Sequence, residues 1–263
     1  MPSLSTFARI FRRNYQIKQR AKRGKTTKQQ QKGLTKGIVM LVDLKKISYI
    51  QDKNFPVPHL TTVKSCGNMK DEQQRIKFCQ NNNIHHKNIV FAQQVHGTFV
   101  KKVSKQDCGT FIPECDGLIT NEKNVTLAIF TADCMPVFMT SRDYSVIALI
   151  HAGWRGLAGG ILESALNSFR NDFGIIPQDV FTYIGPHISK CCYEVGSDVK
   201  KAFDVPESEK YLSLSEQAEK QLRSFGVKRV YINDNCTCHE DQFFFSFRRE
   251  PTEYRMMSLI SSL

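Results

Sequence analysis

The sequence lacks any apolar run long enough to cross a membrane. Its longest apolar stretches, such as Val146–Ile150, are the length of one strand, whereas a spanning helix needs roughly 18 or more apolar residues. A convincing secretory signal peptide is also missing. These absences exclude the common classes of membrane-spanning protein, and we expect a cytoplasmic protein without a membrane partner.

Paired cysteine motifs are few, although the chain has nine cysteines. An odd number without a signal peptide argues against a disulfide scaffold and favours a reducing compartment. The Cys191-Cys192 pair and the Cys236-Thr237-Cys238-His239 cluster could bind a metal, but neither has a second half at zinc-ribbon spacing. We interpret both as ordinary buried thiols.

Acidic residues are absent from residues 1–37, which contain eleven Lys or Arg and so carry +11 of the formal net charge of +12. The rest of the chain is nearly neutral, so nucleic acid is an unlikely partner except through this basic tail. The run Lys28–Lys32 has low complexity, and we expect a disordered extension. The first dozen residues resemble an organellar transit peptide, with a misassigned start as the alternative.

The remaining segment, 38–263, is expected to form one domain in which strands and helices interleave without a regular βαβ repeat. This pattern predicts an α+β fold, a single layered domain of mixed β-sheets flanked by helices. The expected strands are Ile38–Val42, Asn88–Gln94, Thr126–Phe130, Val137–Thr140, Ser145–Ile150, Val180–Ile184, Arg229–Ile232 and Phe243–Phe247, the fourth and fifth as a hairpin, and the expected helices are Asp71–Asn81, Gly156–Phe173 and Leu214–Phe225.

Three short motifs each place a reactive side chain at the end of an expected strand. They are Gln93-Gln94-Val95-His96-Gly97, Thr131-Ala132-Asp133-Cys134-Met135-Pro136 and His151-Ala152-Gly153-Trp154-Arg155-Gly156. Two histidines and one thiolate suit a catalytic zinc ion, which keeps three protein ligands and one open position. Spacing alone does not force His96, Cys134 and His151 together, and each could be a packed or solvated residue.

These motifs, together with Ile184-Gly185-Pro186-His187-Ile188, Cys191-Cys192-Tyr193-Glu194-Val195-Gly196 and Phe244-Phe245-Ser246-Phe247-Arg248-Arg249, resemble the signature blocks of the multicopper polyphenol oxidoreductase or laccase-domain family. That family is also described as purine nucleoside phosphorylase and adenosine deaminase. The blocks occur in the family's order over roughly residues 85–263. The resemblance implies a layered domain and a zinc site made of His96, Cys134 and His151.

The resemblance also implies phosphorolysis of adenosine, inosine and methylthioadenosine to the free base and ribose 1-phosphate, with deamination of adenosine. Phosphorolysis needs cationic donors for phosphate, and the candidates are Arg155, near a helix start, and then Arg248 and Arg249. Deamination needs a proton shuttle, for which Asp133 is a candidate unless it is structural. Purine nucleosides and phosphate are the expected partners; the sequence leaves the oligomeric state open.

Two departures from the family pattern limit this transfer. The N-terminal third lacks a Gly-Phe-Phe-Thr-Arg type of segment, so an expected pocket arginine has no obvious counterpart. The segment Arg249–Arg255 replaces an Asp-Gly and Thr-Gly-Arg pattern, which puts anion binding near Arg255 in doubt.

Three alternatives stay open from the sequence. Cys134 could be the nucleophile of a metal-free hydrolase, activated by His96 or His151. Copper is possible in place of zinc, and a copper-dependent phenol oxidase would use the same His and Cys ligands with Met135 as a weak axial ligand. Finally, an inactive body with a basic tail could serve as a binding protein.

Overall fold

The computed structural model of the protein describes residues 49–262. The expected extension at residues 1–37 and the expected strand Ile38–Val42 lie outside the described residues. Within the described part, the prediction of an α+β fold is confirmed.

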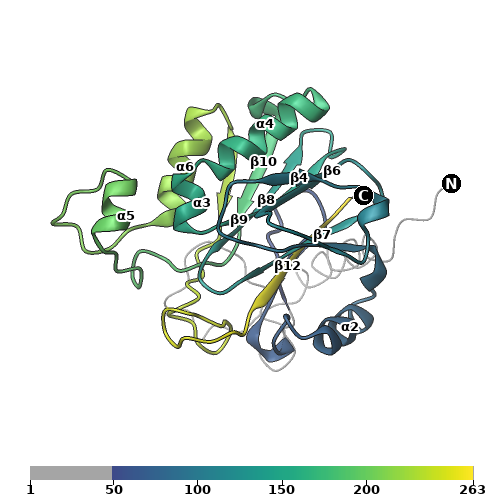
Figure 1. Ribbon diagram of the computed structural model, residues 1–263, viewed down its shortest axis with the longest axis horizontal. Coiled ribbons are helices and arrows are strands. Elements are labelled where there is room, and N and C mark those ends of the chain that lie inside the picture. Colours follow the sequence, from purple (N-terminus) through teal and green to yellow (C-terminus); the bar gives the residue numbers. More distant parts are fainter. Residues whose placement is uncertain (1–48, 263) are drawn as a thin grey trace, which may run out of the picture.

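Two six-stranded mixed sheets form the centre of the molecule (Figure 1). The first sheet has the order β1-β2-β12-β7-β3-β5, and the second has the order β11-β10-β8-β9-β6-β4. The strands are β1 (Tyr49–Ile50), β2 (His59–Thr62), β3 (Ile89–Ala92), β4 (Val100–Lys102), β5 (Phe111–Ile112), β6 (Gly117–Thr120), β7 (Thr126–Thr131), β8 (Met135–Ser141), β9 (Ile147–Ala152), β10 (Val180–Ile184), β11 (Arg229–Ile232) and β12 (Met256–Ser261).

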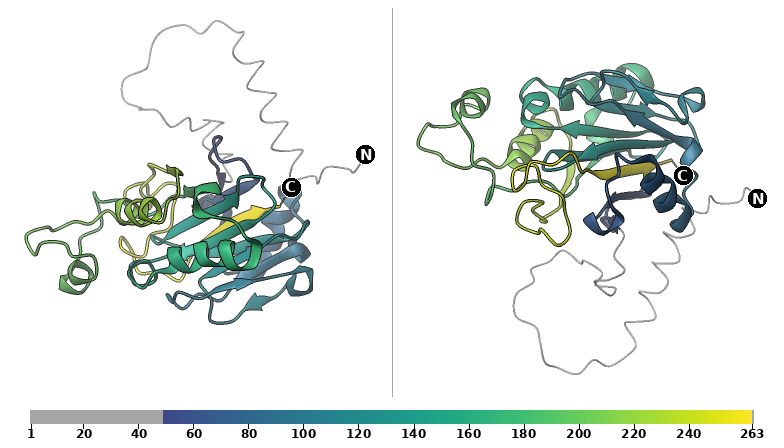
Figure 2. Two further views of the ribbon diagram at one scale, coloured as in Figure 1. Left: turned by 90° about the horizontal axis from the view of Figure 1, so that it is seen from above. Right: turned by 60° about the horizontal axis from the view of Figure 1, so that its bottom comes forward.

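Helices cover the outer faces of the two sheets, which gives four layers (Figures 1 and 2). The α-helices are α2 (Glu72–Asn81), α3 (Trp154–Ala158), α4 (Ile161–Phe173), α5 (Ser197–Ala202) and α6 (Leu214–Ser224). Short 3-10 helices are η1 (Lys64–Cys66), η2 (His86–Asn88), η3 (Lys105–Asp107) and η4 (Pro177–Asp179). Helices α4 and α6 pack on the second sheet, whereas α2 packs on the first.

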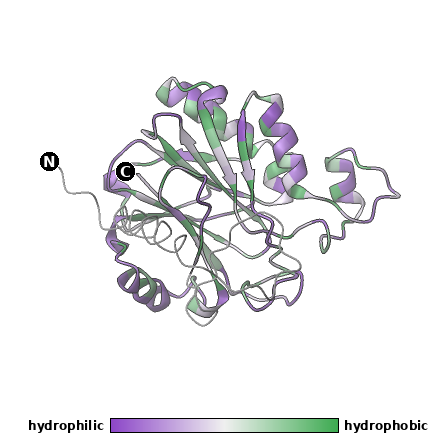
Figure 3. Ribbon diagram, turned by 180° about the vertical axis from the view of Figure 1, so that it is seen from behind, coloured by the Kyte–Doolittle hydropathy of each residue, from purple (hydrophilic) through white to green (hydrophobic). Residues whose placement is uncertain are grey.

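The core follows from strands that are buried on both faces. Along β7, Leu127 and Ile129 face the second sheet, and Ala128 and Phe130 face the layer of α2, because successive side chains of a strand point to opposite faces. Such strands carry few polar residues, and Figure 3 shows the apolar strands enclosed by helices with polar outer surfaces. The sheet layer is therefore a rigid support for the loops at its ends.

The predicted hairpin forms as strands β8 and β9, paired antiparallel. The register places Met135 opposite Ala152 and Pro136 opposite His151. Cys134 directly precedes β8, so the hairpin brings the Cys134 motif and the His151 motif to the same end of the second sheet.

The predicted helix Gly156–Phe173 is two helices. The first, α3, begins at Trp154 and ends at Ala158, and α4 begins after Gly160, whose φ is +93°. This left-handed conformation interrupts a helix and is easy only for glycine. The predicted stop at Gly174 is confirmed, with φ +70°.

The prediction of a strand at Phe243–Phe247 is wrong, because Phe243 and Phe247 lie in turns and the residues between them have no regular structure. The backbone N–H groups of Phe243 and Phe244 donate to the carbonyl of Glu240, and the carbonyl of Phe243 accepts from Lys64. Phe244 and Phe245 are buried all the same. The apolar run thus reflects packing under a loop, and the C-terminal strand that sequence analysis missed is β12.

Among the helices of residues 49–262, we find none with both the length and the apolar character that a bilayer crossing requires.

Candidate functional site

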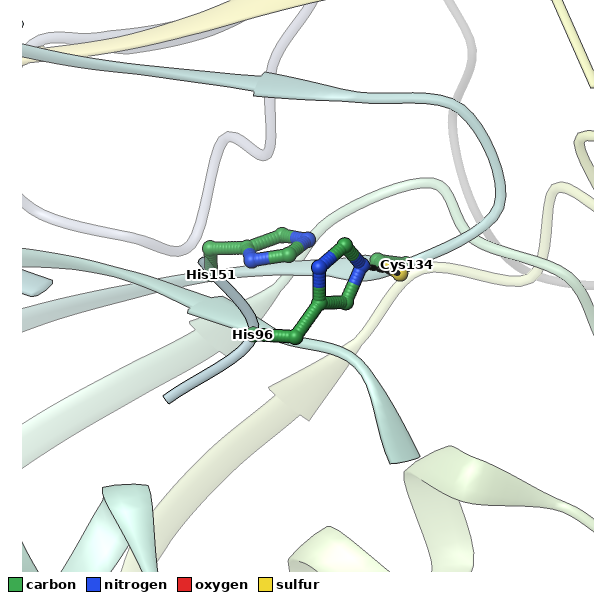
Figure 4. Close-up of side chains that lie close together, drawn as sticks. All are labelled: His96, Cys134 and His151. Carbon is green, nitrogen blue, oxygen red and sulfur yellow. Dashed lines mark hydrogen bonds between the residues drawn. The ribbon is translucent and has the colours of Figure 1, made fainter. Parts of the chain in front are cut away.

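The three candidate ligands come together at one end of the sheets (Figure 4). His96 lies on the loop after β3, Cys134 immediately precedes β8, and His151 is the penultimate residue of β9. One ligand atom from each lies within 4.8 Å of the other two. His96 is exposed, Cys134 half-buried and His151 buried, so the cluster is open on the His96 side.

The donor atoms have the spacing of a small chelating site. The His96 Nε2 atom lies 4.0 Å from the Cys134 Sγ atom. The rings of His96 and His151 are nearly perpendicular, at 78°, with centroids 4.9 Å apart. This arrangement leaves space among the three side chains and does not stack the two imidazoles.

Asp116 holds two of the three ligands, and sequence analysis missed it. Its Oδ1 atom lies 2.7 Å from His151 Nδ1 and accepts from the His96 N–H at 3.0 Å. Its Oδ2 atom accepts from the N–H groups of Val95 and Gly97 at 3.0 and 2.8 Å. This fully buried carboxylate fixes both the His96 loop and the ring of His151, leaving His151 Nε2 for the site.

The local charges favour an ionised pair in the metal-free site. Burial opposes ionisation of Cys134, but the charge of His151 and hydrogen bonds from both histidines lower the pKa of Cys134 to about 6. Burial likewise opposes protonation of His151, but the Cys134 thiolate and Asp116 raise its pKa to about 9. Without a metal, a thiolate therefore faces an imidazolium at neutral pH.

Two glycines allow the close approach of these loops. A Cβ atom on Gly153 would lie 2.9 Å from Cys134 Sγ and 3.1 Å from His96 Cδ2. A Cβ atom on Gly156 would lie 2.8 Å from the carbonyl oxygen of Gly97. The glycines of the His151 motif thus make room for the other two motifs.

The candidate arginines have different surroundings. Arg155 is exposed, and its guanidinium carbon lies 4.5 Å from the ring centroid of Trp154. Arg248 is also exposed; it donates to the Glu194 carbonyl at 2.8 Å and lies over the ring of Tyr193 at 5.2 Å.

The guanidinium of Arg249 is engaged with the backbone. It donates to the carbonyls of Thr237, Cys238 and Phe244 at 3.0, 2.9 and 2.8 Å. The structure therefore packs Arg248 on Tyr193, whereas Arg249 ties the loop before Arg248 to the loop after β11.

Tyr193 links the candidate residues electrostatically. Burial raises the pKa of Tyr193 to about 12, the Cys134 thiolate adds to the rise, and the cations Arg248 and Arg155 oppose it. Of these groups, Arg248 contacts the Tyr193 ring directly, at 5.2 Å from its centroid. Tyr193 belongs to the Cys191–Gly196 motif, but only the folded chain places it under Arg248.

Asp133 bonds to the C-terminal loops, and it lies in the bend between β7 and β8 with φ +86°, so the alternation of strand side chains does not apply to it. Its Oδ1 atom accepts from the Thr237 hydroxyl at 2.7 Å, and its Oδ2 atom accepts from the Ser246 hydroxyl and the Arg248 N–H at 3.1 and 2.7 Å. With all these partners, the buried carboxylate anchors the C-terminal loops. Met135, the suggested axial ligand, packs in the core between the second sheet and its helices.

Two further cations, Lys64 and Arg255, also have partners. Lys64, at the start of η1, pairs with Glu250 at 3.6 Å and lies 5.8 Å from the ring centroid of Phe245. Arg255 donates to the carbonyls of Thr252 and Tyr254. Lys64 is therefore a cation from the N-terminal part of the described chain that lies at the C-terminal loop of Phe245 and Glu250.

A family model described as "Multi-copper polyphenol oxidoreductase laccase" matches residues 67–262. All the site residues described above except Lys64 lie within this match.

Two bacterial proteins are among those that the chain is similar to. "Purine nucleoside phosphorylase YfiH" of Shigella flexneri is 32% identical over 218 residues, which is 78% of this chain and 87% of that protein. "Purine nucleoside phosphorylase YlmD" of Geobacillus stearothermophilus is 36% identical over 194 residues, covering 65% of this chain and 71% of that protein.

Solved structures share the fold. The crystal structure of YlmD from Geobacillus stearothermophilus has a TM-score of 0.74 and 29% identity, with 82% of this chain and 99% of that chain covered. A Bacillus licheniformis hypothetical protein, YfiH, has a TM-score of 0.76 and 27% identity, with 84% and 98% covered.

Proposed function

The chain belongs to the multi-copper polyphenol oxidoreductase laccase family, and from this premise we propose that it is a zinc-dependent purine nucleoside enzyme. The proposed reactions are phosphorolysis of adenosine, inosine and methylthioadenosine and deamination of adenosine. The names of its bacterial relatives support the first reaction. The single observation that carries the proposal is the convergence of His96, Cys134 and His151.

The three side chains fit a zinc ion by their chemistry. Zinc bonds of about 2.0–2.1 Å to nitrogen and about 2.3 Å to sulfur put a tetrahedral N–S pair roughly 3.6 Å apart, and His96 Nε2 and Cys134 Sγ are 4.0 Å apart. Asp116 supplies the carboxylate that commonly orients a zinc-bound histidine. A bound zinc ion would act as a Lewis acid and would activate water for deamination.

We propose that Arg155 and Arg248 bind phosphate. Both residues are exposed, and Arg248 donates to the Glu194 carbonyl. A planar guanidinium donates two hydrogen bonds to a phosphate in a fixed geometry. Arg249, which donates to three carbonyls, would position the neighbouring Arg248.

In phosphorolysis, a phosphate oxygen forms a bond to the anomeric carbon of the ribose. The bond from that carbon to the purine nitrogen breaks, and its electron pair leaves with the base, which takes up a proton. Tyr193 is a candidate hydrogen-bond donor to the departing base or the phosphate, because its raised pKa of about 12 keeps its hydroxyl protonated.

A metal-free cysteine hydrolase is the second candidate, favoured by the thiolate and imidazolium pair. The pKa values of about 6 for Cys134 and about 9 for His151 would give a reactive nucleophile beside a proton donor. Copper is also possible with these ligands, although Met135 in the core gives the phenol oxidase reading little support.

The decisive assay follows release of free base from adenosine, inosine and methylthioadenosine with and without phosphate, together with conversion of adenosine to inosine. Cys134→Ala is compared with Cys108→Ser, a half-buried thiol that bonds the Asn88 carbonyl at a distance from the trio in sequence. We expect phosphate-dependent base release in the wild type and in Cys108→Ser, and its loss by ~100-fold or more in Cys134→Ala.

Failure of the proposal would have a distinct form. Wild-type protein that contains its metal but releases no base in phosphate would overturn the phosphorylase assignment. Base release that does not depend on phosphate would mean hydrolysis. An acyl-enzyme trapped on Cys134 in metal-free protein would support the cysteine hydrolase instead.

A further inference from the structure

A second group of thiols lies outside the trio, at the ends of two neighbouring strands. Strands β10 and β11 run parallel, so the loops that follow them leave the sheet at the same edge. Cys191 and Cys192 lie in the loop after β10, and Cys236 lies in the loop after β11. A bridge between His187 and Cys236 continues the pairing beyond the strands.

The three sulfur atoms are close together. Cys191 Sγ lies 3.5 Å from Cys192 Sγ and 3.6 Å from Cys236 Sγ, and all three lie within 4.8 Å of one another. An ion about 2.3 Å from each of three tetrahedrally placed sulfurs would hold them roughly 3.8 Å apart. The folded chain therefore presents these sulfurs at nearly the separation that a metal ion needs.

The innermost sulfur has a backbone donor. The Ser189 N–H donates to Cys236 Sγ at 3.4 Å. Cys191 is exposed and Cys192 half-buried, so an ion can reach the group from solvent.

We propose that Cys191, Cys192 and Cys236 form a second metal site, separate from the trio, for a thiophilic ion, Zn²⁺ or Cu⁺. Thiolate ligands select these ions. Each thiol would lose its proton to solvent on binding. Cys238, two residues after Cys236 and half-buried, is the nearest further thiol along the chain for a fourth position.

The proposed ion would join two walls of the candidate active site. Tyr193 follows Cys192 directly, and its ring lies under Arg248. Thr237 follows Cys236 directly, and its hydroxyl donates to Asp133, which also accepts from the Arg248 N–H. Metal at the thiol group would therefore stabilise the loops that position Arg248 and Tyr193, without contacting substrate.

Site-resolved alkylation tests the proposal on the unaltered full chain. Reduced, metal-free protein is treated with iodoacetamide, alone and after addition of Zn²⁺ or of Cu⁺ under anaerobic conditions, and each cysteine is followed by mass spectrometry. We expect the metal to slow alkylation of Cys191 and Cys192 by ~10-fold or more, with Cys108 as the internal control. Unchanged rates at Cys191 and Cys192 with both ions would overturn the proposal.

Metal content provides the second measurement and separates this proposal from the active-site assignment. Wild type should bind two equivalents of metal ion. The Cys134→Ala variant should lose one equivalent, and the Cys191→Ser/Cys236→Ser variant should lose the other. Cys108→Ser should keep both. Loss of no equivalent in the Cys191→Ser/Cys236→Ser variant, judged folded by circular dichroism, would contradict the second site. Loss of phosphorolysis in the Cys134→Ala variant would not count against the second metal site. Which ion binds more tightly is decided by competition between Zn²⁺ and Cu⁺ in the Cys134→Ala background.

Discussion

At the residue scale, the candidate site depends on side chains that do not themselves bind metal. Asp116 is fully buried and accepts from three consecutive N–H groups of the His96 loop as well as contacting His151 Nδ1. Burial opposes its ionisation, but the hydrogen bonds from His151 and from the N–H groups of Gly97 and Val95 keep its pKa below the ordinary value. One carboxylate thus couples two motifs.

Replacing Asp116 tests this coupling. In Asp116→Asn, an NH₂ group replaces one of the two acceptor oxygens. This NH₂ group would face either the backbone N–H groups of the His96 loop or the His151 ring, so at least one donor would lose its acceptor. We expect zinc affinity to fall by roughly 10–100-fold, as for other partners of metal-bound histidines, measured by competition with a chelator. Asp143→Asn, in the turn at the far end of the β8–β9 hairpin, is the control. Equal zinc affinity in Asp116→Asn and wild type would contradict the role of Asp116.

Gly153 offers a steric test of the same geometry. Its backbone, with φ −77° and ψ 171°, accepts alanine, so Gly153→Ala introduces only a Cβ atom 2.9 Å from Cys134 Sγ. We expect base release to fall by ~100-fold, because displacements near 1 Å have effects of this size.

Gly196→Ala is the matched control for this change. Gly196 also caps a helix, with φ −86° and ψ 177°, and a Cβ atom there would meet no atom within 4 Å. Equal base release by Gly153→Ala and Gly196→Ala would show that the space left by Gly153 is not needed for the geometry of the trio.

The sequence predicted the three ligands better than their supports. His96, Cys134 and His151 stand in motifs that resemble a known family, so resemblance could select them. Asp116 precedes the short apolar strand β6, and its importance follows from the pairing of Gly117 with Ile150, which puts it beside His151. That pairing is long-range and has no local signal.

At the scale of elements, the sequence predicted the hairpin correctly but mistook a C-terminal loop for a strand. Two segments rich in Val, Ile, Phe and Thr and a polar turn predicted the β8–β9 hairpin, and its register alone brings Cys134 near His151. The run Phe243–Phe247 has the composition of a strand but lies in a loop that is held by Glu240 and Lys64. Local composition cannot distinguish an apolar strand from an apolar loop that is buried by the rest of the chain.

Asp133 gives the test at this scale, since it joins the end of β7 to the loops of Thr237 and Arg248. Asp133→Asn would remove one acceptor oxygen from a buried network, which should cost about 2 kcal/mol of unfolding free energy. Loosening of Arg248 should raise the KM for phosphate by roughly 10-fold, with a smaller change in kcat.

Steady-state kinetics and urea unfolding check this expectation, with the exposed Asp234→Asn as control. A large loss of kcat for deamination at an unchanged KM for phosphate would instead support the proton-shuttle interpretation of Asp133.

At the scale of the whole molecule, His59 joins the two sheets. It lies on β2 of the first sheet, and its ring contacts Phe138 and Tyr183 of the second, with centroids 5.3 and 5.1 Å apart. Nδ1 lies 2.8 Å from the Val57 carbonyl, and Nε2 accepts from the Asp52 N–H at 2.9 Å. These partners require the neutral ring, because a protonated Nε2 cannot accept.

Acid should therefore destabilise the fold. Burial lowers the pKa of His59 from 6.5 to about 4, so between these values the unfolded chain binds more protons than the folded one. The contribution of His59 to stability is then complete above about pH 6.5 and falls toward pH 4 by on the order of 1 kcal/mol per pH unit. Burial also lowers the pKa of His187, which adds a change of the same sign.

Urea unfolding at pH 7.5, 6 and 5 measures this slope. His59→Asn should reduce the slope, and the exposed His85→Asn should leave it unchanged. Stability that stays constant or rises from pH 7.5 to 5 in the wild type would contradict the assignment of His59 as a neutral link between the sheets.

If His96, Cys134 and His151 form a metal-dependent nucleoside site, removing the metal must abolish turnover and returning it must restore turnover. Phosphate-dependent base release from adenosine is measured on protein stripped by a chelator and then titrated with Zn²⁺. We expect no turnover in stripped protein and recovery in proportion to the equivalent of metal that Cys134→Ala fails to bind. Full turnover by stripped protein would contradict it and would favour the thiolate of Cys134 as a metal-free nucleophile.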